Sequence, residues 1–291
     1  MAAGVTSTSQ IDQIQAKIIA AVRYTQVQGT PMAGLMNTTA GRAGMDDTLN
    51  NPKFGSLTAY GATEGTAVAQ AQQLSDTNVT VSASEIVVDV ILTDKLVRTS
   101  SLDLYRSAGR IMGDAMNKKL DQDLLSLLDG LDTSLGSAGT TAAVGYYLAA
   151  VARLQSQSEP APPPFYHVIH GFQFRTIADD LLALSSAAFG TQTPVPNVAQ
   201  AVFENYTMAR MFGVPIVVDN NISVDSSDDA KGGTFSRDAF KFYDWMPLTV
   251  KRQDDIGMRG TRLMLVRDYG YGELVGTFGF EQYFDASTPT S

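Results

Sequence analysis

The chain has 291 residues, of which 44% are hydrophobic, and a formal net charge of -9. It can therefore form a substantial core, but it lacks the clustered Lys and Arg of a free-standing nucleic-acid binder. Having no cysteine, the sequence excludes disulfides, thiolate metal sites and cysteine nucleophiles, and it contains neither a membrane-length apolar run nor a signal-peptide pattern.

Residues 1–52 are not typical of a globular domain. Ser9 can cap a helix that reaches about Gln28, with one apolar stripe made by Ile11, Ile14, Ile18, Ala21 and Val22. The stretch 32–55 is rich in Gly, Thr and Asn and has too few large apolar residues for a core of its own. We therefore expect an N-terminal arm that is either disordered or held by something else.

The stretch 53–100 reads as a strand-rich extension. Apolar and polar residues alternate from Val79, and both faces become apolar between Ile86 and Leu92. We interpret this pattern as a long two-stranded hairpin with a polar tip and a root near the next helix. Since an isolated two-stranded ribbon is marginal in water, such a hairpin needs another surface to lie on. The alternative is a pair of edge strands in a single-chain sheet.

One long amphipathic helix is predicted from Ser101 to Gly130. Ser101 is a good N-cap, Gly130 is a C-terminal stop, and apolar residues recur at helical spacing between them. At 1.5 Å per residue this helix is roughly 43 Å long. Gly109 and Gly113 lie four residues apart, so we hypothesise that a neighbouring segment approaches this flank closely.

The remaining residues alternate between helices and strands. We expect helices at Val144–Ser156, from Gly171 to about Leu184, and from Asn197 to about Asn205. We expect strands at 165–169, 207–212, 214–219, 239–243, 248–252, 262–269 and 273–278, the last two joined by Gly270-Tyr271-Gly272, and a polar surface excursion at 220–233. Without a regular strand-helix repeat, this order indicates an α+β fold.

No candidate for chemistry survives inspection of its spacing. On one strand, His167 and His170 face opposite sides; they converge only if the strand ends at Ile169, and no third metal ligand is evident. Asp219, Asn221 and Ser223 resemble the start of a calcium loop, but the required later Gly and Glu are missing. Asp121 and Asp123 lie on different helix faces, and the glycines at 270–276 lack the spacing of a phosphate-binding loop. We therefore expect no catalytic, cofactor-binding or metal-binding residues, no cofactor and no enzyme activity.

The order of elements resembles the major capsid protein of tailed bacteriophages, with the Johnson fold that encapsulins and the herpesvirus capsid floor share. The resemblance covers nearly the whole chain. It rests on the segments YGATEGTAVAQAQQLSDTNVTVSASEIVVDVILTDKL, FYHVIHGFQFRTIADDLL, NYTMARMFGVPIVVDNNI, AFKFYDWMPLTVKRQDD and RGTRLMLVRDYGYGELV, with the long helix after the first of them.

The resemblance implies a shell subunit with four parts. These are an N-terminal arm at 1–52, an extended loop hairpin at 53–100, a peripheral domain at 101–139 and 239–291 with the long helix as its spine, and an axial domain at 140–238. The implied partners are copies of the chain in hexons and pentons, a portal, a cement protein, and packaged DNA through non-specific contact only, with no membrane. The expected location is the virion, after synthesis in the host cytoplasm.

Two features separate this chain from some relatives. The extended-loop motif begins near residue 55, which leaves no room for a fused scaffolding region, so we expect a separate scaffolding protein. No lysine lies between Lys53 and Lys95, so the loop tip lacks the nucleophile for an isopeptide crosslink. The alternative functions are an encapsulin-type nanocompartment shell, which shares the fold, and a soluble α+β enzyme.

Overall fold

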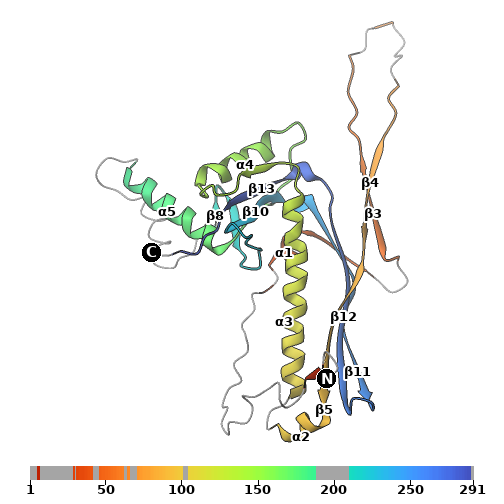
Figure 1. Cartoon of the computed structure of the whole chain (residues 1–291). Coiled ribbons are helices and arrows are strands. Elements are labelled where there is room, and N and C mark those ends of the chain that lie inside the picture. Colours follow the sequence, from red (N-terminus) through yellow and green to blue (C-terminus); the bar gives the residue numbers. More distant parts are fainter. Residues whose placement is uncertain are drawn as a thin grey trace.

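The computed structural model describes residues 5–6, 29, 31–41, 46–61, 64–65, 71–100, 104–187 and 210–289. Within them, two sheets and a long helix form an elongated body from which a two-stranded ribbon projects (Figure 1). The mixture of helices with largely antiparallel sheets confirms the expected α+β class. The helices predicted at 9–28 and 197–205 and the N-cap predicted at Ser101 lie outside the described residues.

The five-stranded sheet has the order β1-β5-β12-β11-β2. Its strands are β1 (Val5–Thr6), β5 (Ser84–Thr93), β12 (Gly260–Glu273), β11 (Phe240–Asp255) and β2 (Asn37–Ala40). The central strands are antiparallel, whereas β1 and β2 join the two edges in parallel. Pro247 lies within β11, beside the two register shifts that bend this strand, so the two strands predicted at 239–243 and 248–252 are one.

The six-stranded sheet has the order β6-β13-β10-β7-β9-β8. Its strands are β6 (Ser134–Gly136), β13 (Gly279–Asp285), β10 (Asp229–Ser236), β7 (Phe165–Ile169), β9 (Val214–Val218) and β8 (Arg210–Met211). Two helices accompany this sheet, α4 (Val144–Ser156) and α5 (Gly171–Ala187). The predictions for α4, β7 and the start of α5 are confirmed residue by residue.

The long helix α3 (Leu104–Leu125) runs along the body and continues as a 3-10 helix, Ser126–Gly130. Its apolar stripe packs first against β5 and β12 and then, near its C-terminal end, enters the main core with residues of the six-stranded sheet. The buried stripe consists of Leu104, Met112, Met116, Leu120, Leu124 and Leu125. The single predicted helix is therefore confirmed, although its last turn is tighter than an α-helix.

We predicted that the N-terminal arm is disordered or held by something other than its own chain. This prediction is wrong for residues 31–41, which pack against the rest of the same chain. The short helix α1 (Met32–Leu35) places Met32 and the following Met36 in the main core, both with no exposed surface. Strand β2 then pairs with β11, from Asn37 opposite Lys241 to Ala40 opposite Asp244. Two methionines are enough to anchor this segment because the core that receives them is supplied by the rest of the chain.

The predicted hairpin differs from the observed ribbon in its strands. The ribbon is formed by β3 (Thr48–Phe54) and β4 (Asp76–Ser82), which pair from Thr48 opposite Ser82 to Phe54 opposite Asp76. Strand β5, expected within the hairpin, instead pairs with β12 along its whole length. The apolar residues on both faces of β5 reflect this place in a sheet covered by α3.

Two further predictions are wrong at glycines that pack closely against other strands of the same chain. Gly270 and Gly272 do not form a turn, because β12 continues through them, and a Cβ on Gly270 would lie 2.6 Å from the Ser82 carbonyl oxygen. Likewise, Asp229–Gly233 is not a surface excursion but part of the buried strand β10, where a Cβ on Gly232 would lie 2.5 Å from the Val168 oxygen. In both places glycine permits close packing within a strand.

We predict that Gly270→Ala lowers the free energy of unfolding by about 2–4 kcal/mol, because the new Cβ must displace the backbone at Ser82. Gly109→Ala is the matched control: apart from its own helix, no atom of the described residues lies within 4 Å of its Cβ position, and alanine favours a helix by about 0.5–1 kcal/mol. Denaturant unfolding of both variants measures the difference. Equal effects of the two substitutions would contradict the packing described at β12.

His167 generates a second prediction, on acid stability. Its side chain is fully buried, its Nδ1 lies 2.7 Å from Thr234 Oγ1, and burial lowers its pKa to about 4. Between pH 6.5 and 4 the histidine is protonated in the unfolded chain, where its pKa is near 6.5, but stays neutral in the folded chain. The free energy of unfolding therefore falls as the pH drops from about 6.5 towards 4. Urea unfolding should show that His167→Gln loses about 2 kcal/mol less than the original protein between pH 7 and pH 5. Equal losses would show that His167 is not the group responsible.

Candidate assembly surfaces

The ribbon β3–β4 projects from the body (Figure 1). Val81 is buried against β12 and Lys53 forms an ion pair with Glu159, so this part of the ribbon contacts the body. Four large apolar side chains on the ribbon and its loop at 55–75 are more than half exposed: Phe54, Leu57, Tyr60 and Leu74. A two-stranded ribbon with solvent on both faces is marginal in water, and exposed apolar side chains on it mark a contact surface.

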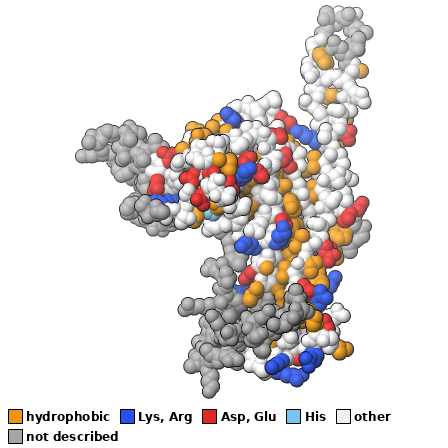
Figure 2. All heavy atoms as spheres, viewed as in Figure 1, with side chains coloured by type: hydrophobic (Ala, Val, Ile, Leu, Met, Phe, Trp, Pro, Cys, Tyr) orange, Lys and Arg blue, Asp and Glu red, His pale blue; other side chains and the backbone are white. Residues whose placement is uncertain are grey.

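A second surface lies where α3 crosses the five-stranded sheet. A groove of about 270 Å³ runs between Gly109 and Gly113 of α3 and the β11–β12 pair, lined mostly by apolar side chains. No atom of the described residues lies within 4 Å of a Cβ position on either glycine, so this flank is open. Beside the groove, Leu248 and Val250 of β11 are 45% and 66% exposed. Figure 2 shows hydrophobic side chains gathered along this part of the body.

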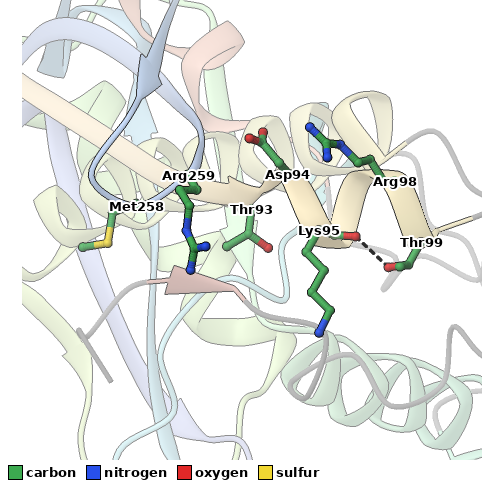
Figure 3. Close-up of a pocket in the computed structure, with 7 residues that line it drawn as sticks. All are labelled: Thr93, Asp94, Lys95, Arg98, Thr99, Met258 and Arg259. Atoms are coloured by element: carbon green, nitrogen blue, oxygen red, sulfur yellow. Dashed lines mark hydrogen bonds between the residues drawn. The ribbon is translucent and has the colours of Figure 1, made fainter.

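A third surface is positively charged and lies at the end of the body opposite the ribbon. A hollow of about 580 Å³ separates α2 (Asp94–Thr99) from the turn that joins β11 to β12. In Figure 3, Lys95 and Arg259 extend to the same side of this hollow, whereas Arg98 extends to the other side with Asp94. None of the ion pairs found among the described residues involves Lys95, Arg98 or Arg259.

The backbone at Arg259 holds the β11–β12 turn against the start of α2. Arg259 has a φ of 49°, a left-handed conformation that Gly or Asn adopts more easily, while its carbonyl oxygen accepts a 2.9 Å hydrogen bond from the Asp94 amide. The turn is thus fixed to the start of α2. Figure 2 shows Lys and Arg side chains at this end of a chain whose net charge is -9.

The side chains considered for chemistry are dispersed through the fold. His167 lies in the core beside Tyr147 and Thr234, whereas His170 begins the turn into α5, where burial lowers its pKa. Asp123 accepts a 2.8 Å hydrogen bond from the Tyr269 hydroxyl and pairs with Lys119. Across the described residues, no group of three or more His, Cys, Asp or Glu side chains is placed to hold a metal ion. No helix in the same residues is long and apolar enough to cross a bilayer.

One arrangement escaped the sequence analysis. Asp121, on the buried side of α3, lies against Asp219 and Asn221 at the end of β9, and its Oδ2 accepts a 2.9 Å hydrogen bond from Asn221 Nδ2. The sequence pattern treated Asp219 and Asn221 only as the start of an incomplete calcium loop, and Asp121 only as lying on a different helix face from Asp123. The available signal was the spacing of Asp121 from Leu124 and Leu125, three and four residues further on, which places it on the buried face of the helix.

Comparison with protein families gives an independent result. A family model described as phage capsid protein matches residues 78–278, more than half of the chain. Compared by sequence with curated proteins, the chain matches none. The match extends from β4 of the ribbon to the 3-10 helix that precedes β13, and so includes the spine helix and most of both sheets.

Solved structures share the fold at low sequence identity. A chain of Mycobacterium phage Che8 superposes with a TM-score of 0.71 and 18% identity over 90% of this chain and 93% of that one. The capsid asymmetric unit of cyanophage Pam1 superposes with a TM-score of 0.71 and 15% identity, over 99% of this chain and 100% of that one. The head structure of Helicobacter pylori bacteriophage KHP40 superposes with a TM-score of 0.74 and 9% identity, over 97% of this chain and 99% of that one. These likenesses confirm the expected Johnson fold.

The chain therefore belongs to the phage capsid protein family, a structural family and not an enzyme family, and is a major capsid protein of the virion.

Proposed function

We propose that copies of this capsid protein assemble into pentamers and hexamers that close into an icosahedral shell around double-stranded DNA. The ribbon is the observation that carries the proposal, because its apolar side chains at Phe54, Leu57 and Leu74 are exposed far from the body's own core. A neighbouring copy can cover them. Closed symmetry repeats this contact around the shell and turns modest pairwise energies into a stable assembly.

The proposed seat of the ribbon is the body of the adjacent copy. The groove between α3 and the β11–β12 pair offers apolar surface beside an open glycine flank, which suits an extended apolar segment. The positive hollow at α2 suits an acidic surface of another copy, since a chain with a net charge of -9 presents carboxylates widely.

We propose the four-part division of the chain with the following changes. The arm remains at the N-terminus, but its segment 31–41 packs on the chain's own body, and the ribbon begins at Thr48. The peripheral domain contains α3 and the five-stranded sheet, including β5. The axial domain contains α4, α5 and the six-stranded sheet, including β13, although that strand falls within the range 239–291 expected for the peripheral domain.

The further partners that we propose are a separate scaffolding protein, a portal and a cement protein. Packaged DNA is proposed to contact the shell only non-specifically, because a subunit with a net negative charge does not bind phosphate groups strongly. Synthesis is proposed to occur in the host cytoplasm. These partners follow from the capsid family and from the charge of the chain.

The ribbon contact can be tested by placing charge on its apolar residues. We predict that Leu57→Asp and Leu74→Asp each raise the concentration needed for particle formation at least tenfold, because burying a leucine contributes roughly 1.5–3 kcal/mol and a buried carboxylate costs more. Sedimentation velocity of the purified protein, assembled with its scaffold where one is needed, measures this change. Gln73→Asp, an exposed polar position on the same ribbon, is the control and should assemble normally. Normal assembly of both leucine variants would contradict the ribbon contact.

The contents of native particles test the proposed role of the shell. Particles purified from infected cells should contain long double-stranded DNA that resists added nuclease until the shell is disrupted. Extraction and sizing of that DNA is the measurement. Particles filled with a single protein cargo and free of DNA would instead identify a nanocompartment of the encapsulin type.

A further inference from the structure

The pair formed by Asp121 and Asp219 lies where three separate parts of the chain meet. Asp121 comes from near the C-terminal end of the spine helix α3, Asp219 follows β9 of the six-stranded sheet, and both side chains have no exposed surface. The third part is the N-terminal segment. The Met32 amide donates a 3.3 Å hydrogen bond to Asp121 Oδ1, and Asn221 Nδ2 lies 3.4 Å from the Gly29 carbonyl oxygen.

The hydrogen bonds around the pair leave one carboxylate oxygen without a donor. Asp121 is satisfied by the Met32 amide on Oδ1 and by Asn221 Nδ2 on Oδ2. Asp219 Oδ1 accepts a 2.9 Å bond from the Asn221 amide, but its Oδ2 is buried with no donor among the described residues. Its remaining neighbour within hydrogen-bonding range is the Asp121 carboxyl. Two buried carboxylates in contact are strongly unfavourable unless one of them carries a proton.

The electrostatic surroundings are consistent with a retained proton. Burial and then the Asp121 carboxyl together raise the pKa of Asp219 to about 7, while the Asn221 amide opposes the shift. Among the described residues, Asp121 is the one charged group that acts on Asp219. His170 follows Ile169, whose carbonyl accepts a hydrogen bond from the Asp219 amide, and burial lowers the pKa of His170.

We propose that Asp121 and Asp219 share one proton and thereby hold the N-terminal segment against α3 and the end of β9, and that loss of this proton loosens the joint. With the proton present, the pair is a hydrogen-bonded carboxylic acid and carboxylate, and the Met32 amide keeps its acceptor. With both groups ionised, two negative charges repel each other in a site with no cation among the described residues. The segment that carries Met32 and Met36 is then the easiest part to release, because it is short and joined to the body at one sheet edge.

The direction of the pH effect follows from linkage. The closed joint binds the proton with a pKa near 7, whereas in the open joint Asp219 regains an ordinary value near 3.9. Between these values the closed state holds more protons, so rising pH favours opening. The joint is tightest below about pH 4, weakens as the pH rises from there towards 7, and changes no further above that. In a shell subunit, the released segment is available to a neighbouring copy.

Hydrogen exchange of the peptide covering residues 31–41 tests this proposal, with rates corrected for the intrinsic pH dependence of amide exchange. In the original protein, protection should fall about tenfold per pH unit between roughly pH 5 and 7 and level off above that. In Asp219→Asn, the side-chain amide supplies a permanent hydrogen to Asp121, so protection should be high and independent of pH. Asp121→Asn supplies the reciprocal variant in case Asp219→Asn does not fold.

Two further measurements complete the test. Asp228→Asn, an exposed aspartate in the same loop at a φ of 62° that asparagine tolerates, should behave as the original protein does. Protection that is independent of pH in the original protein, or a pH dependence that persists in both Asn variants, would overturn the proposal. Recovery of protection above pH 7 on adding calcium would also overturn it, because the pair would then be a cation site and not a proton-sharing pair.

Discussion

The ribbon sets the main constraint on this molecule. Two strands that pair with each other through seven register positions, with solvent on both faces, cannot bury enough apolar surface to order themselves. The body supports only part of the ribbon: Val81 packs against β12 and Lys53 pairs with Glu159, whereas Phe54, Leu57 and Leu74 are more than half exposed. We propose that this extension gains its stability from another copy, which would give a physical reason for assembly into a shell.

The body provides a rigid platform for that extension. The spine helix α3 packs against the five-stranded sheet over its first half and enters the main core with residues of the six-stranded sheet over its second half, so the two sheets share one support. The same helix carries the open glycine flank and, through Asp121, the joint with the N-terminal segment. Surfaces for contact with other copies are thus placed on an element that the core holds firmly.

Hydrophobic periodicity predicted the two helices α3 and α4 and the short buried strand β7. The 3.6-residue pattern located α3 and α4, and the short apolar run at Phe165–Ile169 located β7. The errors have one physical origin, which is long-range contact. Gly270 and Gly232 look like turn residues in the sequence but are close-packing residues in strands, and Met32 and Met36 are too few for a core until the rest of the chain supplies one. The partnership of Asp121 with Asp219 joins residues almost a hundred positions apart, which spacing along a single chain does not reveal.

The most direct test of this account is a cryo-electron microscopy reconstruction of the native particle. It should show β3 and β4 of each subunit as ordered density lying on the body of the adjacent subunit, with Leu57 and Leu74 covered by that neighbour. A shell in which the ribbon is folded back onto its own subunit, or extends into solvent without contacting another copy, would contradict the account.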